Sequence, residues 1–167
     1  SAYVCHQLLL NPQLNILVVS ASKNRADDFS TFTLRLINEI DVLAHLKPRE
    51  DQRQSKVSFD VKPARASHAP SVKSLGITGQ LTGSRSDLVI ADDVESANNS
   101  ATMGMRDKLS EQVKEFESIL KPQGRIIFLG TMQTEMSLYN VLPTRGYKQR
   151  IWTARYPTEK QLNNFGN

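Results

Sequence analysis

Two neighbouring carboxylates, Asp92 and Asp93, follow an unbroken apolar run and are the residues of this chain best suited to chemistry. The run, residues 88–91, is typical of a strand buried on both faces of a parallel sheet. Ligands of such sheets bind beyond the carboxyl ends of the strands, so both acids are predicted to face a ligand site. Because successive side chains on a strand point to opposite faces, we expect the two acids to have different roles.

These carboxylates suit the chemistry of a nucleoside triphosphate. One of them can hold the water shell of a Mg²⁺ ion that bridges two phosphates. The other, or Glu95 two residues further on, can orient or deprotonate the water that attacks the γ-phosphate. An apolar strand that ends in acids is also the Walker B pattern of P-loop ATPases. The alternative is a structural turn, since Asp often follows a strand for that reason.

The composition is ordinary for a globular protein and excludes several classes. The 167 residues, 39% of them hydrophobic and 23% charged, suffice for one domain with a substantial core. A formal net charge of +4 permits contact with nucleic acid without requiring it. The one cysteine, Cys5, excludes an internal disulfide and a cysteine-based zinc site. No apolar run approaches the ~20 residues of a membrane span.

The elements that must position the acids alternate between helical and extended patterns. This order predicts an α/β fold with a mostly parallel central sheet flanked by helices. Helices are expected over residues 1–10, 24–46, 101–121 and 137–142, where apolar residues recur at helical spacing. Strands are expected over residues 16–19, 72–77, 87–93 and 125–131, with an outer strand over 57–61. Residues 147–156 also alternate and predict a strand, with Trp152 packed in the sheet.

Three polar segments near strand ends are further candidates. Residues 20–25 contain hydroxyls and two cations that can face phosphate or DNA, or form a solvated loop. The glycine-rich residues 76–86 predict a tight connection near the ligand or a neighbouring subunit. It ends beside Arg85, which is either aimed at phosphate or a surface arginine. Thr131 and Gln133 can sense a γ-phosphate and report hydrolysis, or belong to an ordinary turn.

Three stretches together resemble one protein family. They read Ile-Leu-Val-Val-Ser-Ala-Ser-Lys-Asn-Arg-Ala-Asp-Asp-Phe (residues 16–29), Gly-Ile-Thr-Gly-Gln-Leu-Thr-Gly-Ser-Arg-Ser-Asp-Leu-Val-Ile-Ala-Asp-Asp-Val-Glu (76–95) and Ile-Ile-Phe-Leu-Gly-Thr-Met-Gln-Thr-Glu (126–135). The chain resembles the ATPase domain of the large terminase subunit of tailed phages, closest to the T7-like group. The resemblance implies a P-loop NTPase fold of the RecA-like (ASCE) type that is truncated at its N-terminal side.

The resemblance also implies a function and partners. Members of this family form an oligomeric ring at the portal of an empty procapsid and use ATP and Mg²⁺ to push double-stranded DNA inside. The expected partners are DNA, the portal protein, the small terminase subunit and further copies of the chain. The expected location is the host cytoplasm, with no membrane involved.

The site roles that the resemblance implies follow the matching positions. Asp92 would bind Mg²⁺, and Asp93 or Glu95 would be the catalytic carboxylate. The usual family pattern ends in Asp-Glu, whereas this chain has Asp-Asp with Glu95 two residues later. Thr131 and Gln133 would lie in the coupling motif that contacts the nucleotide. Arg85 would correspond to an arginine that acts on a neighbour's nucleotide.

The resemblance implies a domain organisation as well. Residues 1–157 would be the ATPase-domain part with Walker B and the coupling motif, and residues 158–167 a linker toward a C-terminal nuclease domain. The Walker A loop is expected before residue 1, so the chain alone is expected to bind ATP weakly and to turn over none. Two alternatives stay open: a helicase-like P-loop motor, and a non-catalytic module that binds nucleic acid or protein.

Overall fold

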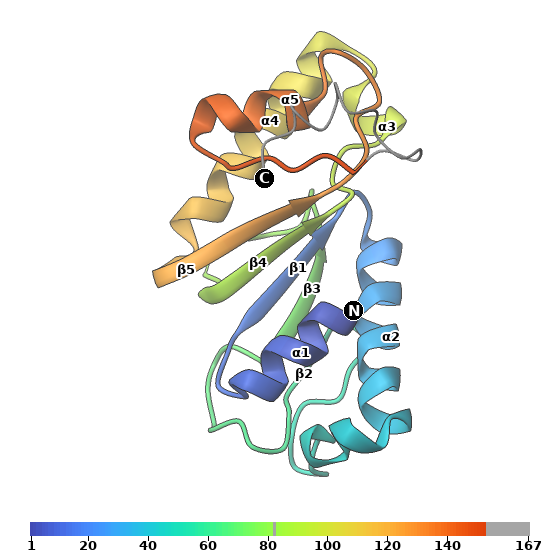
Figure 1. The fold of residues 1–167 in the computed structure, drawn as a ribbon, viewed down its shortest axis with the longest axis vertical. Helices are drawn as coiled ribbons and strands as arrows, with labels where there is room; N and C mark the ends of the chain where they lie inside the picture. Colours follow the sequence, from blue (N-terminus) through green and yellow to red (C-terminus); the bar gives the residue numbers. More distant parts are fainter. Residues whose placement is uncertain (82, 153–167) are drawn as a thin grey trace, which may run out of the picture.

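A five-stranded sheet in the order β2-β3-β1-β4-β5 forms the centre of the structure (Figure 1). The computed structural model describes residues 1–81 and 83–152. Its strands are β1 (Ile16–Ser20), β2 (Ser58–Phe59), β3 (Val72–Gly76), β4 (Ser86–Asp92) and β5 (Leu120–Leu129). Its helices are α1 (Ala2–Leu10), α2 (Lys23–Glu39), η1 (Asp41–Leu46), α3 (Ala97–Ser100), α4 (Met103–Ser118), α5 (Leu138–Val141) and η2 (Leu142–Arg145), where η marks a 3-10 helix.

The sheet is parallel except at one edge. β1 pairs in parallel with β3 and with β4, and β4 pairs in parallel with β5. The short outer strand β2 runs antiparallel to β3. All five positions of β1 are buried, as are residues 88–91 of β4, as expected for strands covered on both faces. The predicted α/β class and the predicted interior strands are therefore confirmed.

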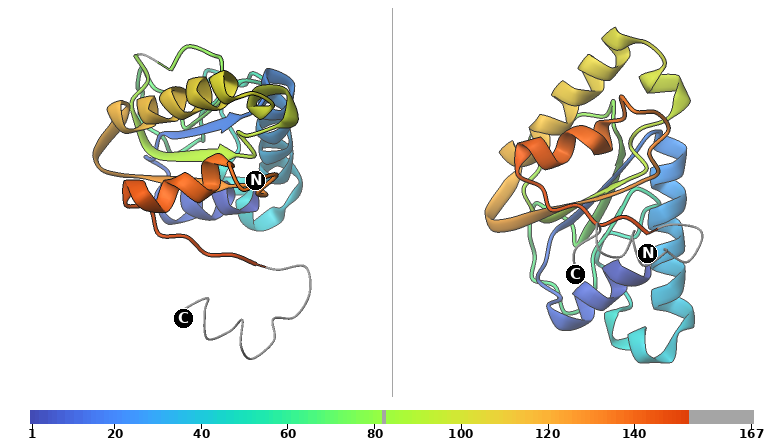
Figure 2. Two further views of the ribbon diagram at one scale, coloured as in Figure 1. Left: turned by 90° about the horizontal axis from the view of Figure 1, so that it is seen from above. Right: turned by 45° about the horizontal axis from the view of Figure 1, so that its top comes forward.

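Helices cover both faces of the sheet (Figure 2). On one face α1, α2 and η1 contribute Leu8, Ile37 and Leu46 to a core that includes alternate residues of β1 and β4. On the other face α4 contributes Leu109, Val113 and Phe116 to a second core with the intervening strand residues. The two cores place β1 and β4 in the middle layer, so the end of β4 is held from both sides.

The helix predicted over residues 24–46 is interrupted. α2 ends at Glu39, Ile40 is extended, and the chain continues as η1. After the break, Leu43 and Leu46 are buried in the core. Ile40, at the break itself, is 41% exposed. Periodicity therefore placed Leu43 on the buried face correctly, placed Ile40 there wrongly, and missed the break in the backbone.

The helix predicted over residues 101–121 is also shorter than expected. α4 ends at Ser118, and β5 already begins at Leu120, five residues before the predicted strand. Pro122 and Gly124 do not stop the strand, because the chain absorbs them in an irregularity where Gln123 has a φ of 66°. Proline and bulges are tolerated in this way in edge strands, and β5 is one of the two edge strands of the described sheet.

The predicted strand over residues 147–156 is wrong in its described part. Residues 147–152 pair with no described strand, and Trp152 is 81% exposed instead of packed in the sheet. Tyr147 packs edge-on against Phe128 with ring centroids 5.2 Å apart, whereas residues 148–152 are all exposed, so the alternating pattern does not correspond to a buried face. Residues 153–156 of this prediction, and the predicted linker, lie outside the described residues.

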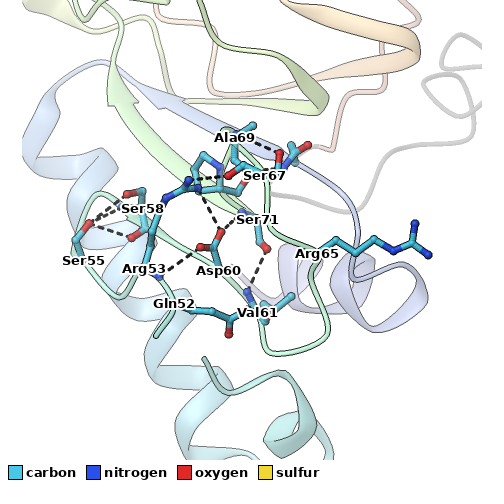
Figure 3. A network of polar contacts seen from close by, with 12 residues as sticks. Gln52, Arg53, Ser55, Ser58, Asp60, Val61, Arg65, Ser67, Ala69 and Ser71 are labelled. Atoms are coloured by element: carbon cyan, nitrogen blue, oxygen red, sulfur yellow. Dashed lines mark hydrogen bonds and ion pairs between the residues drawn. The ribbon is translucent and has the colours of Figure 1, made fainter. Parts of the chain in front are cut away.

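The loops around β2 are fixed by polar contacts (Figure 3). The Arg53 guanidinium donates to the Ser67 carbonyl at 2.7 Å and pairs with Asp60 at 3.6 Å. Asp60 accepts from the Ser71 amide, and the Ser71 hydroxyl accepts from the Val61 amide. These bonds replace the missing ladder partners of a two-residue edge strand and hold it against β3.

Candidate functional site

The carboxyl ends of four strands meet in one row. Ser20 of β1 is in register with Gly76 of β3 and with Asp92 of β4, and Asp92 is in register with Leu129 of β5. The acid pair, the 20–25 turn and the loop after β5 therefore share one edge of the sheet. This is the edge at which ligands bind in open α/β sheets.

Asp92 is a half-buried carboxylate with no hydrogen bond to its oxygens among the described residues. Burial raises the pKa of Asp92 above its ordinary value of 3.8, and repulsion from Asp93 adds to this rise. The positive charge of Arg25 opposes it. A carboxylate that has lost water without gaining a donor is favourably placed to bind a cation.

Asp93 directly follows Asp92, but its backbone does not have the extended conformation of a strand. Its φ of 51° ends β4, so the expected alternation of the two acids to opposite faces stops at Asp92. Arg25, in the first turn of α2, pairs with Asp93 at 2.5 Å, with both side chains partly exposed. Arg25 belongs to the predicted 20–25 segment, but only the fold identifies it as the partner of an acid.

Glu95 is placed differently from the two aspartates. It is 2% exposed, and one of its carboxylate oxygens accepts from the Ser137 hydroxyl at 2.7 Å and the Leu138 amide at 2.8 Å. Its other oxygen has no hydrogen-bond partner in the described part of the chain. Glu95 therefore holds the amino end of α5, where Ser137 is the N-cap residue.

Thr131 and Gln133 lie in an exposed loop that starts at the same edge. The Asp93 amide donates to the Leu129 carbonyl at 2.8 Å, so the start of this loop adjoins the acid pair. The Gln133 amide makes a 3.5 Å contact with the Thr131 carbonyl. The structure thus brings both residues to the edge that Asp92 and Asp93 occupy, without a contact between them and the acids among the described hydrogen bonds.

Arg85 lies at the opposite end of the parallel strands, where their amino ends are. It precedes β4, whereas Asp92 ends it, and seven residues of strand separate two positions by roughly 20 Å. Arg85 lines a cavity of about 290 Å³ together with Lys73 and Lys121. It cannot reach the acid pair of its own chain, so any action on phosphate at an acid pair requires a second copy.

The donor set at the acid pair fits a magnesium ion held mainly through water. No group of three or more metal-ligating side chains occurs within residues 1–81 and 83–152. Next to Asp92 in the register, the Ser20 hydroxyl is buried and has no partner in the same part of the chain. Mg²⁺ in nucleotide sites takes one or two protein oxygens and completes its shell with water and phosphate, which matches Asp92 with Ser20 close by.

The amino end of α1 also points to this edge. Ser1, the residue that precedes α1, lies close enough to Asp92 for the two to interact electrostatically. A helix amino end carries unpaired N–H groups and a partial positive charge, which favour an anion. A cation ligand and an anion-favouring helix end therefore lie side by side.

These features define an α/β protein whose parallel sheet presents a carboxylate pair beside a helix amino end. No family model matches the chain. It is 55% identical over 163 residues, 96% of its length, to the terminase large subunit of Enterobacteria phage T3. This similarity confirms the resemblance to terminase large subunits. The chain spans 28% of the length of that relative.

Among the described residues, no helix has both the length and the apolar character needed to cross a bilayer.

Proposed function

We propose that this chain is the hydrolytic part of a phage DNA-packaging ATPase with a P-loop, RecA-like fold. The observation that carries the proposal is the desolvated carboxylate of Asp92 at the carboxyl edge of an interior parallel strand, beside the amino end of α1. The identity to a terminase large subunit supports packaging over a helicase-like motor. A binding module with purely structural carboxylates would have no reason to leave Asp92 without a donor.

Within this proposal each residue at the edge has a distinct task. Asp92 would hold Mg²⁺, which would supply positive charge to neutralise the phosphates of ATP. Asp93 orients the attacking water, and Arg25 holds the Asp93 carboxylate in place until the nucleotide arrives. Thr131 and Gln133, in the loop after β5, would sense the γ-phosphate and respond to its loss.

The proposal extends to the partners of the longer protein. The motor would act on double-stranded DNA as a homo-oligomeric ring, with the portal protein and small terminase subunit, in the host cytoplasm. The Walker A loop would belong to sequence outside this chain. The chain by itself is therefore expected to bind ATP weakly and to show no useful turnover.

The test uses the full-length protein with Asp92→Asn, Asp93→Asn and the control Asp28→Asn. Asp28 is an exposed acid of α2 with no hydrogen bond or ion pair in the described part of the chain. Each site variant is expected to reduce ATP hydrolysis at least ~100-fold with an unchanged circular dichroism spectrum, and the control to match wild type. Wild-type rates in Asp92→Asn would refute the proposed role. A wild-type protein that binds DNA without hydrolysing ATP would favour the binding module.

A further inference from the structure

The loop after β5 is held at both of its ends by the segment that contains the acid pair. At its start, the Leu129 carbonyl accepts from the Asp93 amide at 2.8 Å and from the Tyr139 hydroxyl at 3.3 Å. At its end, Ser137 and Leu138 donate to Glu95. Residues 131–136 between these anchors are all exposed.

We propose that Glu95 is a positioning residue that couples the acid pair to this loop and to α5, and is not the group that acts on the attacking water. The inference rests on the proposed function, because it assigns a role within the same site. The sequence leaves Asp93 and Glu95 as alternative catalytic carboxylates, and this assignment leaves Asp93 as the catalytic one.

The connection between the acids and Glu95 is short and tightly packed. Only Val94 separates Asp93 from Glu95, and its side chain is 0% exposed. Tightly packed cores transmit displacements instead of absorbing them. A shift of the Asp93 backbone when the nucleotide binds or is hydrolysed would therefore move Glu95 and, through its two hydrogen bonds, the first turn of α5.

Tyr139 adds a second contact between the same elements. Its ring lies against Gly130, where a β-carbon would collide with the phenol ring. Burial raises the pKa of Tyr139 to about 12, so its hydroxyl remains a hydrogen-bond donor at physiological pH. α5 is thus attached through Glu95 to the segment that follows β4 and through Tyr139 to the end of β5, so both ends of the loop are linked to α5.

The position of Glu95 argues against direct catalysis. One of its oxygens is engaged by two donors of its own chain, and the side chain is 2% exposed. The cavity that Glu95 lines, about 210 Å³, is bounded by residues of α4 and α5 such as Arg106 and Val141. Arg25, Asp92 and Asp93 do not line it, so a water there would not face the acid pair.

Three substitutions in the full-length protein separate the two roles. Glu95→Gln keeps a carbonyl oxygen that can accept from Ser137 and Leu138 but loses the charge that a general base needs. Glu95→Ala leaves both buried donors without an acceptor. Ser137→Ala removes one of the two bonds, together with the hydroxyl that accepts from the Tyr139 amide, and retains Glu95. Glu111→Ala, an exposed acid of α4, is the matched control.

The first readouts are the rate of ATP hydrolysis and the amount of DNA packaged per ATP. For Glu95→Gln we expect ATP hydrolysis and packaging within about threefold of wild type, against the ~100-fold loss of Asp93→Asn. For Glu95→Ala we expect packaging per ATP to fall at least tenfold, and for Ser137→Ala a smaller loss. Glu95→Gln as inactive as Asp93→Asn, or Glu95→Ala equal to Glu111→Ala in both readouts, would overturn the inference.

A second readout, amide hydrogen exchange of residues 130–138, does not depend on turnover. Exchange is expected to rise in Glu95→Ala and Ser137→Ala and to stay at the wild-type level in Glu95→Gln and Glu111→Ala. If Glu95→Ala does not fold, Ser137→Ala decides the outcome. Unchanged exchange in the variant that folds would contradict the link. A wild-type protein without ATPase activity would instead refute the proposed function, and the exchange data would still decide whether Glu95 holds the loop.

Discussion

The charged carboxylate of Asp92 destabilises the folded protein, and the same carboxylate is the proposed ligand of Mg²⁺. Its carboxylate is half-buried, has no donor among the described residues, and has a pKa raised chiefly by burial. An acid with a raised pKa binds a proton more readily in the folded state than in the unfolded chain. Its contribution to stability is therefore greatest below the ordinary pKa of 3.8 and is lost as pH rises through the raised value. Such local destabilisation is common at functional sites.

Replacing this carboxylate should therefore stabilise the fold. Asp92→Asn is expected to raise the melting temperature near neutral pH, because it removes a desolvated charge that also repels Asp93. The gain should shrink on acidification toward the ordinary pKa and vanish where Asp92 is protonated in both states. Thermal unfolding followed by circular dichroism across this pH range measures it, with Asp28→Asn as control. A gain that is independent of pH would argue against charge as its cause.

At the scale of elements, the site depends on how closely β3 approaches the turn between β1 and α2. A β-carbon on Gly76 would lie 2.8 Å from the Lys23 amide nitrogen and 3.1 Å from the Ser22 carbonyl carbon. These are backbone atoms, so the clash could be relieved only by moving one element away from the other. The same turn positions Arg25 for its contact with Asp93.

This close approach gives a prediction with a matched control. Gly76→Ala is expected to lower the free energy of unfolding by about 1–3 kcal/mol, the usual cost of overpacking. Gly104→Ala, in α4, meets nothing within 4 Å and is expected to raise it by up to about 1 kcal/mol through reduced backbone entropy. Urea denaturation of both variants measures the difference. Equal effects of the two substitutions would mean that β3 and the turn can separate freely.

At the scale of the whole molecule, the two functional candidates lie at opposite edges of one sheet. Arg85 precedes β4 and Asp92 ends it, while Arg85 shares its cavity with Lys73 and Lys121. In a head-to-tail ring, one subunit's amino edge can face the next subunit's carboxyl edge. The geometry therefore permits Arg85 to act only in trans.

Mixing inactive subunits of the full-length protein tests this arrangement. Arg85→Ala and Asp92→Asn proteins are each expected to be inactive in ATP hydrolysis. A mixture is expected to regain measurable activity, because some interfaces combine an intact Arg85 with an intact Asp92. Arg65→Ala is the control, since Arg65 is a cation with no ion pair in the described part of the chain. Absence of complementation, with rings shown to mix, would remove Arg85 from the site.

Much of the fold could be predicted because it depends on local patterns. Continuous apolar runs identified β1 and β4, and helical spacing identified the buried faces of α2 and α4. The same patterns failed at Ile40, where the helix is interrupted, and at Trp152, which is exposed instead of packed in the sheet. Apolar spacing reports which side chains face the core, but it does not report where the hydrogen-bonding pattern of the backbone changes.

The sequence by itself determined that Asp92 ends an interior parallel strand and that Asp93 follows it, because burial on both faces requires an unbroken apolar run. Only the tertiary structure decided which residues each of the acids contacts. Asp93 meets Arg25 from 68 residues away, and Glu95 meets Ser137 from 42 residues away. Partners at such distances in sequence leave no local periodicity, since they are brought together by the register of the sheet and the packing of its helices.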